Sequence, residues 1–146
     1  ETFVENVQKI QQQSRAHMKK TKKLLEQLAI YAVNDIAEHL KTEQSVIVYK
    51  EEGDMEFIGM MANIVKDRKL LEEQDQRVII LAAGEKKQGG PIIITGSTNE
   101  IVQKTGKAVM ATLNGVKGGG KGRWQGKAQS WDDIDNLENA IKQLVF

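Results

Sequence analysis

The sequence predicts an α/β fold: a single small sheet of about four to five strands, flanked by helices and preceded by a long N-terminal helix. Three observations carry this prediction. Apolar residues recur at spacings of three and four through residues 2–40, which is typical of a helix. After residue 45, short β-branched runs alternate with amphipathic segments. The chain has 146 residues and 40% hydrophobic content, enough for one ordinary domain and too apolar for a chain disordered throughout.

The N-terminal helix carries two different apolar patterns. Its heptad stripe consists of Phe3, Val7, Ile10, Ser14, His17, Thr21, Leu24, Leu28 and Tyr31. Three central members are polar, so pairing with a second copy through this stripe would be weak. A broader face in the second half should pack on a domain, through Leu24, Leu25, Leu28, Ala29, Ala32, Ile36 and Leu40. We therefore divide the chain into a helical segment, 1–42, that projects as a coiled coil or links to an upstream domain, and an α/β domain, 43–146.

Within the α/β domain, local signals predict the order of elements. We expect strands at 46–49, 77–82 and 91–95 and a short edge strand at 124–128. Helices should follow Asp54 and Ser97, with Asp54 as an N-cap and Ser97 forming a capping box with Glu100. The second of these helices should end at 114–115, and a last helix should occupy 132–146.

The most informative segment is glycine-rich and basic. Residues 115–128 contain six glycines, four Lys or Arg residues, one Trp and no acid. Glycine permits positive φ and close backbone approach, Lys and Arg donate to phosphates, and Trp offers a face for stacking on a base. These properties predict a loop that holds a polyanion, with a flexible solvated loop as the alternative.

The charge distribution supports the first interpretation. No Asp or Glu lies between Ile101 and Trp131, and that stretch carries six Lys or Arg residues. The whole chain has a net charge of +1, so the remainder carries 1 − 6 = −5. Positive charge is therefore concentrated in one segment, where it would release counterions from a nucleic acid.

Several chemistries are excluded by what the sequence lacks. It has no cysteine, and its two histidines, His17 and His39, lie 22 residues apart on one predicted helix, too far to share a metal. Lys121 is followed by Gly122, so the segment is no nucleotide-hydrolase phosphate loop. No apolar run reaches the length of a membrane span. We expect a cytoplasmic chain without catalytic residues, metal or cofactor of its own.

The motif Gly118-Gly-Gly-Lys-Gly-Arg-Trp-Gln-Gly-Lys-Ala-Gln129 resembles the glycine-rich signature of the DHHA1-type domain. That domain forms the C-terminal end of alanyl-tRNA synthetases and of the long alanyl-tRNA editing proteins. The form of the motif found here is most similar to that of the eukaryotic editing proteins. The pieces Leu24-Leu25-x-x-Leu28-Ala29, Glu52-Gly-Asp-x-Glu-Phe57 and Ala62-Asn63 agree in order and register. The resemblance covers roughly residues 20–131.

The resemblance implies a parent that hydrolyses Ser-tRNA(Ala) or Gly-tRNA(Ala) through an upstream zinc domain absent from this chain. This chain would be its non-catalytic tRNA(Ala)-binding domain and could also support a homodimer through the N-terminal helix. The expected RNA-binding residues are Lys117, Gly118, Gly119, Gly120, Lys121, Gly122, Arg123, Trp124 and Lys127. Trp124 is expected either to stack on a base or to anchor the core.

Three other assignments stay open at this point. One is a C-terminal domain of alanyl-tRNA synthetase, and another is a dimerisation module with an incidental basic loop. The third is the substrate-binding domain of a DHH-type phosphoesterase, a family whose related motif reads Gly-Gly-Gly-His. Lys121 stands in place of that histidine and the chain contains no Asp-His-His, which counts against the phosphoesterase.

Overall fold

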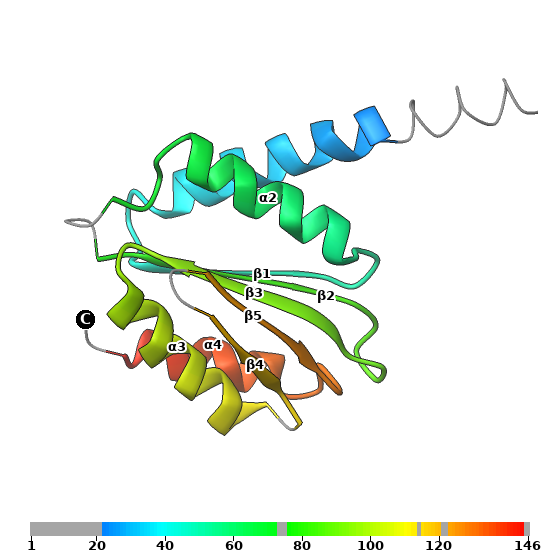
Figure 1. The fold of residues 1–146 in the computed structure, drawn as a ribbon, viewed down its shortest axis with the longest axis vertical. Helices are drawn as coiled ribbons and strands as arrows, with labels where there is room; N and C mark the ends of the chain where they lie inside the picture. Colours follow the sequence, from blue (N-terminus) through cyan, green and yellow to red (C-terminus); the bar gives the residue numbers. More distant parts are fainter. Residues whose placement is uncertain (1–21, 73–75, 114, 121–122, 145–146) are drawn as a thin grey trace, which may run out of the picture.

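A five-stranded mixed sheet forms the centre of the protein (Figure 1). The computed structural model describes residues 22–72, 76–113, 115–120 and 123–144. In spatial order the strands are β1 (Ser45–Lys50), β2 (Val78–Ala83), β3 (Gly90–Gly96), β5 (Arg123–Ala128) and β4 (Lys117–Gly119). Only β1 and β2 pair in parallel, and the other neighbours are antiparallel.

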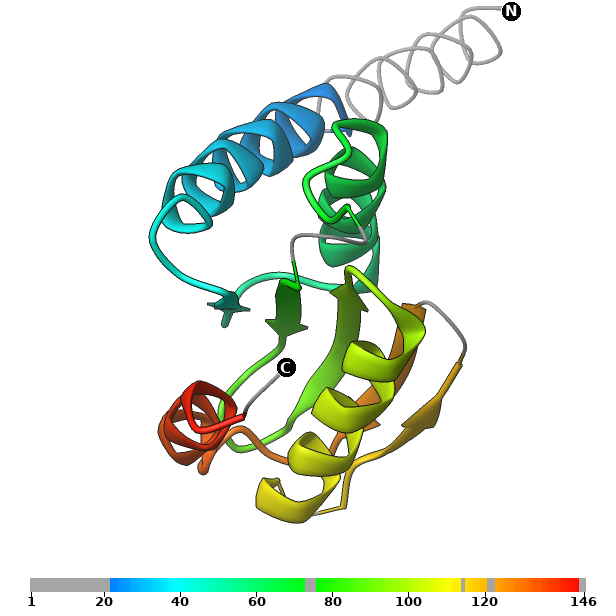
Figure 2. The ribbon, with the colours of Figure 1, turned by 90° about the vertical axis from the view of Figure 1, so that its left-hand side faces the viewer.

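Helices cover both faces of this sheet. The N-terminal helix, described over residues 22–39, lies with α2 (Met55–Asp67) on one face. The opposite face is covered by α3 (Asn99–Thr112) and α4 (Ile134–Lys142), so the sheet lies between two helical layers (Figure 2). The predicted fold class is confirmed: within the described residues, one small sheet is flanked by four helices.

Strand β2 explains why the core has two halves. All six of its residues are buried, and the pleat sends alternate side chains to opposite faces. Val78, Ile80 and Ala82 join the core under α3 and α4. Their neighbours Ile79, Leu81 and Ala83 join the core under α2 and the N-terminal helix. A continuous apolar run is what a strand covered on both faces requires.

The strand at 124–128 was predicted to lie at the edge of the sheet, and this prediction was wrong. β5 pairs with β3 on one side and with β4 on the other. The edge is instead formed by β4, a segment that was expected to be a loop. Its sequence Lys-Gly-Gly has little β propensity, so only the pairing with β5 makes it a strand.

Two caps test the local predictions. Asp54 is confirmed as an N-cap, because its side chain accepts a hydrogen bond of 2.9 Å from the Phe57 amide. The capping role of Ser97 was wrong: Thr98 caps α3 and accepts from the Ile101 amide at 3.3 Å. Ser97 instead accepts from the Arg77 amide through its hydroxyl at 2.9 Å, which extends the β2–β3 pairing by one residue.

The N-terminal helix packs through a narrower face than predicted. Its buried residues are Ala29, Val33 and Ile36, followed by Leu40 one residue past its end, whereas Leu24 and Leu28 are 54% and 58% exposed. The buried stripe is rotated from the heptad stripe, whose described members Leu24, Leu28 and Tyr31 all face solvent. The remaining members of the heptad stripe lie outside the described residues. Within the described part of the chain, no helix combines the length and hydropathy needed to cross a membrane.

Candidate nucleic-acid interface

The glycine-rich basic segment is a β-hairpin. Strands β4 and β5 pair antiparallel, with Lys117 opposite Lys127, Gly118 opposite Gly126 and Gly119 opposite Gln125. The expected loop is therefore wrong for residues 117–119, whose backbone pairs in the sheet, whereas 124–128 forms a strand as predicted. Lys121 and Gly122 lie between the strands and outside the described residues.

The pleat of the hairpin sorts its side chains by chemistry. Alternate residues of a strand face opposite sides, and directly opposed residues share a side. Arg123, Gln125 and Lys127 therefore lie on one face of the sheet, together with Lys117 and Gly119 of β4. Trp124, Gly126 and Ala128 lie on the other. We call the first set of five residues the basic ledge.

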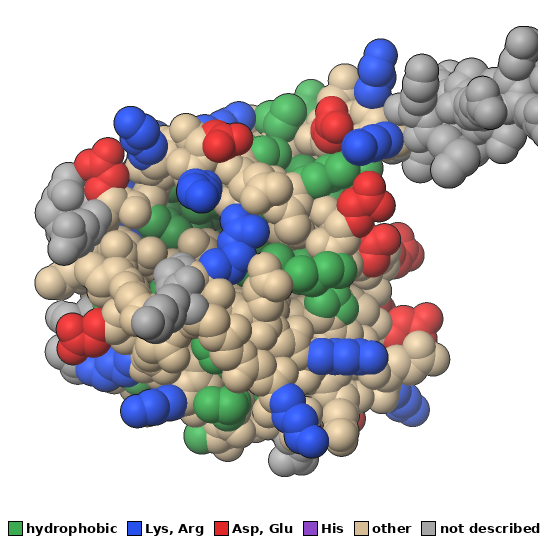
Figure 3. All heavy atoms as spheres, in the orientation of Figure 1, with side chains coloured by type: hydrophobic (Ala, Val, Ile, Leu, Met, Phe, Trp, Pro, Cys, Tyr) green, Lys and Arg blue, Asp and Glu red, His purple; other side chains and the backbone are tan. Residues whose placement is uncertain are grey.

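The basic ledge is open to solvent. On its side of the sheet α2 packs over β2 and β3, and four of the five ledge residues are exposed while Arg123 is half-buried. Figure 3 views the molecule from the edge of the sheet that β4 and β5 form, with α2 above and α3 below as in Figure 1, and shows Lys and Arg side chains over its middle and lower part. The structure thus places Lys117, Arg123 and Lys127 on one side of the sheet, and their contact with RNA stays a prediction.

Helix α2 supplies two further groups that the sequence interpretation missed. The Arg123 guanidinium donates a hydrogen bond of 3.1 Å to the Asn63 side-chain oxygen, which links β5 to α2. Lys66, one helical turn further along, is exposed on the same side. Among the described residues, Lys66, Lys117, Arg123 and Lys127 form no ion pair. Their charges are available to a ligand.

Trp124 is an anchor of the core, which is the second of its two expected roles, and is not exposed for stacking on a base. The residue is only 2% exposed. A Cβ atom built on Gly106 of α3, or on Gly118 or Gly126 of the hairpin, would lie 2.8–2.9 Å from atoms of the indole. The ring is therefore enclosed between α3 and the hairpin and presents no face to a base.

Packing also explains most of the hairpin glycines. At Gly118 a Cβ would lie 2.5 Å from the Gln125 carbonyl oxygen and 2.7 Å from the Gly126 Cα. Gly120 adopts φ +140°, and its carbonyl accepts a hydrogen bond from the Gln103 amide group. Gly119 alone of the three has open space around it, with nothing within 4 Å. Close approach of a ligand to the backbone can therefore explain the glycine at 119, but it is not needed to explain the glycines at 118 and 120.

This difference gives a matched pair of substitutions. Gly118→Ala should lower the free energy of unfolding by about 1–3 kcal/mol, because the added methyl meets backbone atoms that cannot move aside cheaply. Gly119→Ala should leave it within about 0.5 kcal/mol, because the methyl points into open space. Urea unfolding of both variants checks the prediction. Equal effects of the two substitutions would contradict the packing described here.

Two groups with perturbed pKa values lie away from the basic ledge. A hydrogen bond to the Asp35 carbonyl raises the pKa of His39, and the Asp35 carboxylate adds to that effect. Burial raises the pKa of Tyr49, whose hydroxyl donates to the Gly84 carbonyl at 2.7 Å. Among the described residues, no group of three or more metal-ligating side chains is assembled.

Comparison with known proteins identifies relatives of this chain. The chain resembles alanyl-tRNA editing proteins along almost its entire length. It is 31% identical over 145 residues to "Alanyl-tRNA editing protein Aarsd1" of Rattus norvegicus, which covers 99% of this chain and 33% of that protein. Aarsd1-A of Xenopus laevis is 29% identical over 146 residues, and Aarsd1 of Danio rerio is 26% identical over 143. The chain spans about a third of the length of these curated relatives. No protein-family model matches it.

Proposed function

We propose that this chain is a tRNA-binding, non-catalytic part of an alanyl-tRNA editing protein. The names of its relatives, whose alignments cover almost the whole of this chain, support the editing context. The DHHA1-type motif, with its basic residues at 117–127, supports the placement within such a protein. The substrate of the whole protein would be mischarged tRNA(Ala), hydrolysed by a part of the protein other than this one.

The observation that carries the proposal is the basic ledge. Lys117, Arg123 and Lys127 face the same way from two adjacent strands, with no described acid paired to them. Strand geometry separates Arg123 from Lys127 by about 13 Å along β5, so the two side chains reach different phosphates. A flat sheet face with few groups able to read base edges suits recognition of the RNA backbone and shape.

The direct test is binding of a tRNA(Ala) transcript to this chain over a series of salt concentrations. Three phosphate contacts should give a log–log slope of roughly −2 to −3, because each contact releases condensed counterions. Fluorescence anisotropy with labelled tRNA measures the slope. If the tRNA does not bind at low salt, or binds with affinity independent of salt, the proposed function is wrong.

A further inference from the structure

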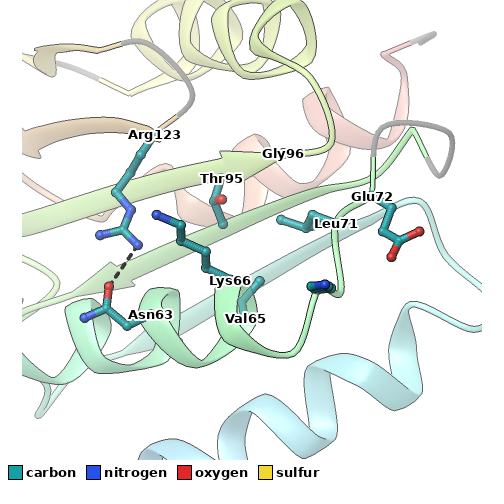
Figure 4. Close-up of a pocket in the computed structure, with 9 residues that line it drawn as sticks. Asn63, Val65, Lys66, Leu71, Glu72, Thr95, Gly96 and Arg123 are labelled. Carbon is teal, nitrogen blue, oxygen red and sulfur yellow. Dashed lines mark hydrogen bonds between the residues drawn. The ribbon is translucent and has the colours of Figure 1, made fainter.

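A cleft opens beside the basic ledge, at the end nearest Arg123. It has a volume of about 520 Å³ and lies between the C-terminal half of α2, the segment that follows it, and the ends of β3 and β5 (Figure 4). Its lining residues are Asn63, Val65, Lys66, Lys69, Leu71, Glu72, Thr95, Gly96 and Arg123. This volume is within the range of small-molecule sites, about 300–1,000 Å³.

Three cationic side chains from different elements line this cleft. Lys66 comes from the last turn of α2, Lys69 from the residues just after it, and Arg123 from the start of β5. In Figure 4 the Lys66 and Arg123 side chains extend toward each other across the opening, close to Thr95. Asn63 fixes the guanidinium by the hydrogen bond at 3.1 Å. The position of the Arg123 charge is therefore set by a contact with α2.

The neighbouring Arg68 shows that not every basic residue here turns into the cleft. Its guanidinium donates to the Asn34 side chain of the N-terminal helix, on the other side of α2. A basic residue in the last turn of a helix is favoured by the helix dipole, which accounts for Lys66 alone. The dipole does not explain why Arg123 of β5 meets Lys66 over the same opening.

The charge balance of the cleft favours an anion. Three cations and one carboxylate, Glu72, line it, so the walls carry a net charge of 3 − 1 = +2. Like charges that converge on a partly enclosed space repel each other, and an anionic ligand between them removes that cost. The hydroxyl of Thr95 and the amide of Asn63 add hydrogen-bonding groups, and Val65 and Leu71 add apolar surface. This mixture suits a group with a charged end and a flat, less polar body.

We propose that this cleft binds a nucleotide, with its phosphate held between Lys66, Lys69 and Arg123. Because Arg123 belongs both to the basic ledge and to the cleft, the nucleotide can be one unit of the RNA strand on the ledge. A free nucleotide offers the same chemistry. Binding of a nucleotide within an RNA strand rests on the proposed function, and binding of a free nucleotide does not.

The experiment uses two probes on the full chain. Adenosine 5′-monophosphate is titrated against ¹⁵N-labelled protein, with adenosine as the probe that lacks the phosphate. We expect the monophosphate to shift the amide signals of Lys66, Thr95 and Gly96, and adenosine to shift them at least tenfold less at equal concentration. The variant Lys66→Ala/Lys69→Ala should abolish the shifts. The matched variant Lys86→Ala/Lys87→Ala, on the β2–β3 turn, should retain them.

Binding of tRNA(Ala) to the same variants separates the two sources. A severalfold loss for Lys66→Ala/Lys69→Ala, with none for Lys86→Ala/Lys87→Ala, supports a nucleotide of bound RNA. If the monophosphate shifts the cleft signals and the protein binds no tRNA, the cleft is a free-nucleotide site and the proposed function fails. If the monophosphate causes no shifts and tRNA affinity is unchanged in the variant, the cleft proposal is overturned. Thr95→Val, which removes only the hydroxyl, should weaken monophosphate binding without loss of the folded spectrum.

Discussion

Replacing Trp124 with alanine is expected to lower the free energy of unfolding by about 3–5 kcal/mol. The side chain is 2% exposed and fills the space between α3 and the β4–β5 hairpin. Its removal leaves a cavity lined by Gly106, Gly118 and Gly126, and glycines have no side chains with which to fill it. Chemical unfolding followed by circular dichroism measures the loss.

A control and a second readout make this prediction specific. Met110→Ala truncates another large apolar side chain, but one that is 44% exposed on α3, and should cost much less. Binding of tRNA is measured at a temperature where both variants are folded. If Trp124→Ala keeps the stability of the unchanged protein and loses tRNA affinity, the indole stacks on a base and the buried position described here is wrong.

Removing the paired lysines of the basic ledge should have the largest effect on RNA binding. Lys117 and Lys127 are direct partners across β4 and β5, and both are exposed. The variant Lys117→Ala/Lys127→Ala should bind tRNA(Ala) about tenfold or more weakly at moderate salt and reduce the log–log salt slope by roughly 1.5–2 units, because two phosphate contacts are lost. Anisotropy titrations at several salt concentrations give both quantities.

The matched control removes the same formal charge at a distance. Lys41→Ala/Lys142→Ala alters two exposed lysines that form surface ion pairs with Glu38 and Glu138. Both lysines lie outside the hairpin, so this double variant tests the effect of a change in net charge alone. Equal weakening of tRNA binding by both double variants would mean that the chain attracts RNA through its overall charge, without a defined interface.

The elements that were predicted correctly are those whose signals lie in adjacent residues of the sequence. The strands around 46–49, 77–82 and 91–95 were found from short β-branched runs, and Asp54 from its position before an apolar helix. Ser97 and Thr98 are adjacent residues that can both cap a helix. Only the pairing of β2 with β3, which occupies Ser97 with the Arg77 amide, decides between them.

Non-local pairing explains what the sequence could not show. Lys-Gly-Gly at 117–119 has no strand signal of its own and becomes β4 because β5 is present beside it. The grouping of Lys117, Arg123 and Lys127 follows once two strands are known to pair, but the contributions of Asn63 and Lys66 depend on where α2 crosses the sheet. No spacing in the sequence links residue 63 to residue 123.

Three glycines surround the indole of Trp124, but only one of them depends on the size of that ring. At Gly106 the three nearest atoms to an added Cβ all belong to the indole, so a smaller side chain at 124 would allow alanine there. At Gly118 and Gly126 an added Cβ would also meet a backbone carbonyl oxygen of the opposite strand, at 2.5 and 2.6 Å, so glycine is required at both whatever residue occupies 124. Two hairpin glycines are therefore fixed by the close approach of β4 to β5, while the lysines and arginine between them can vary independently of that constraint.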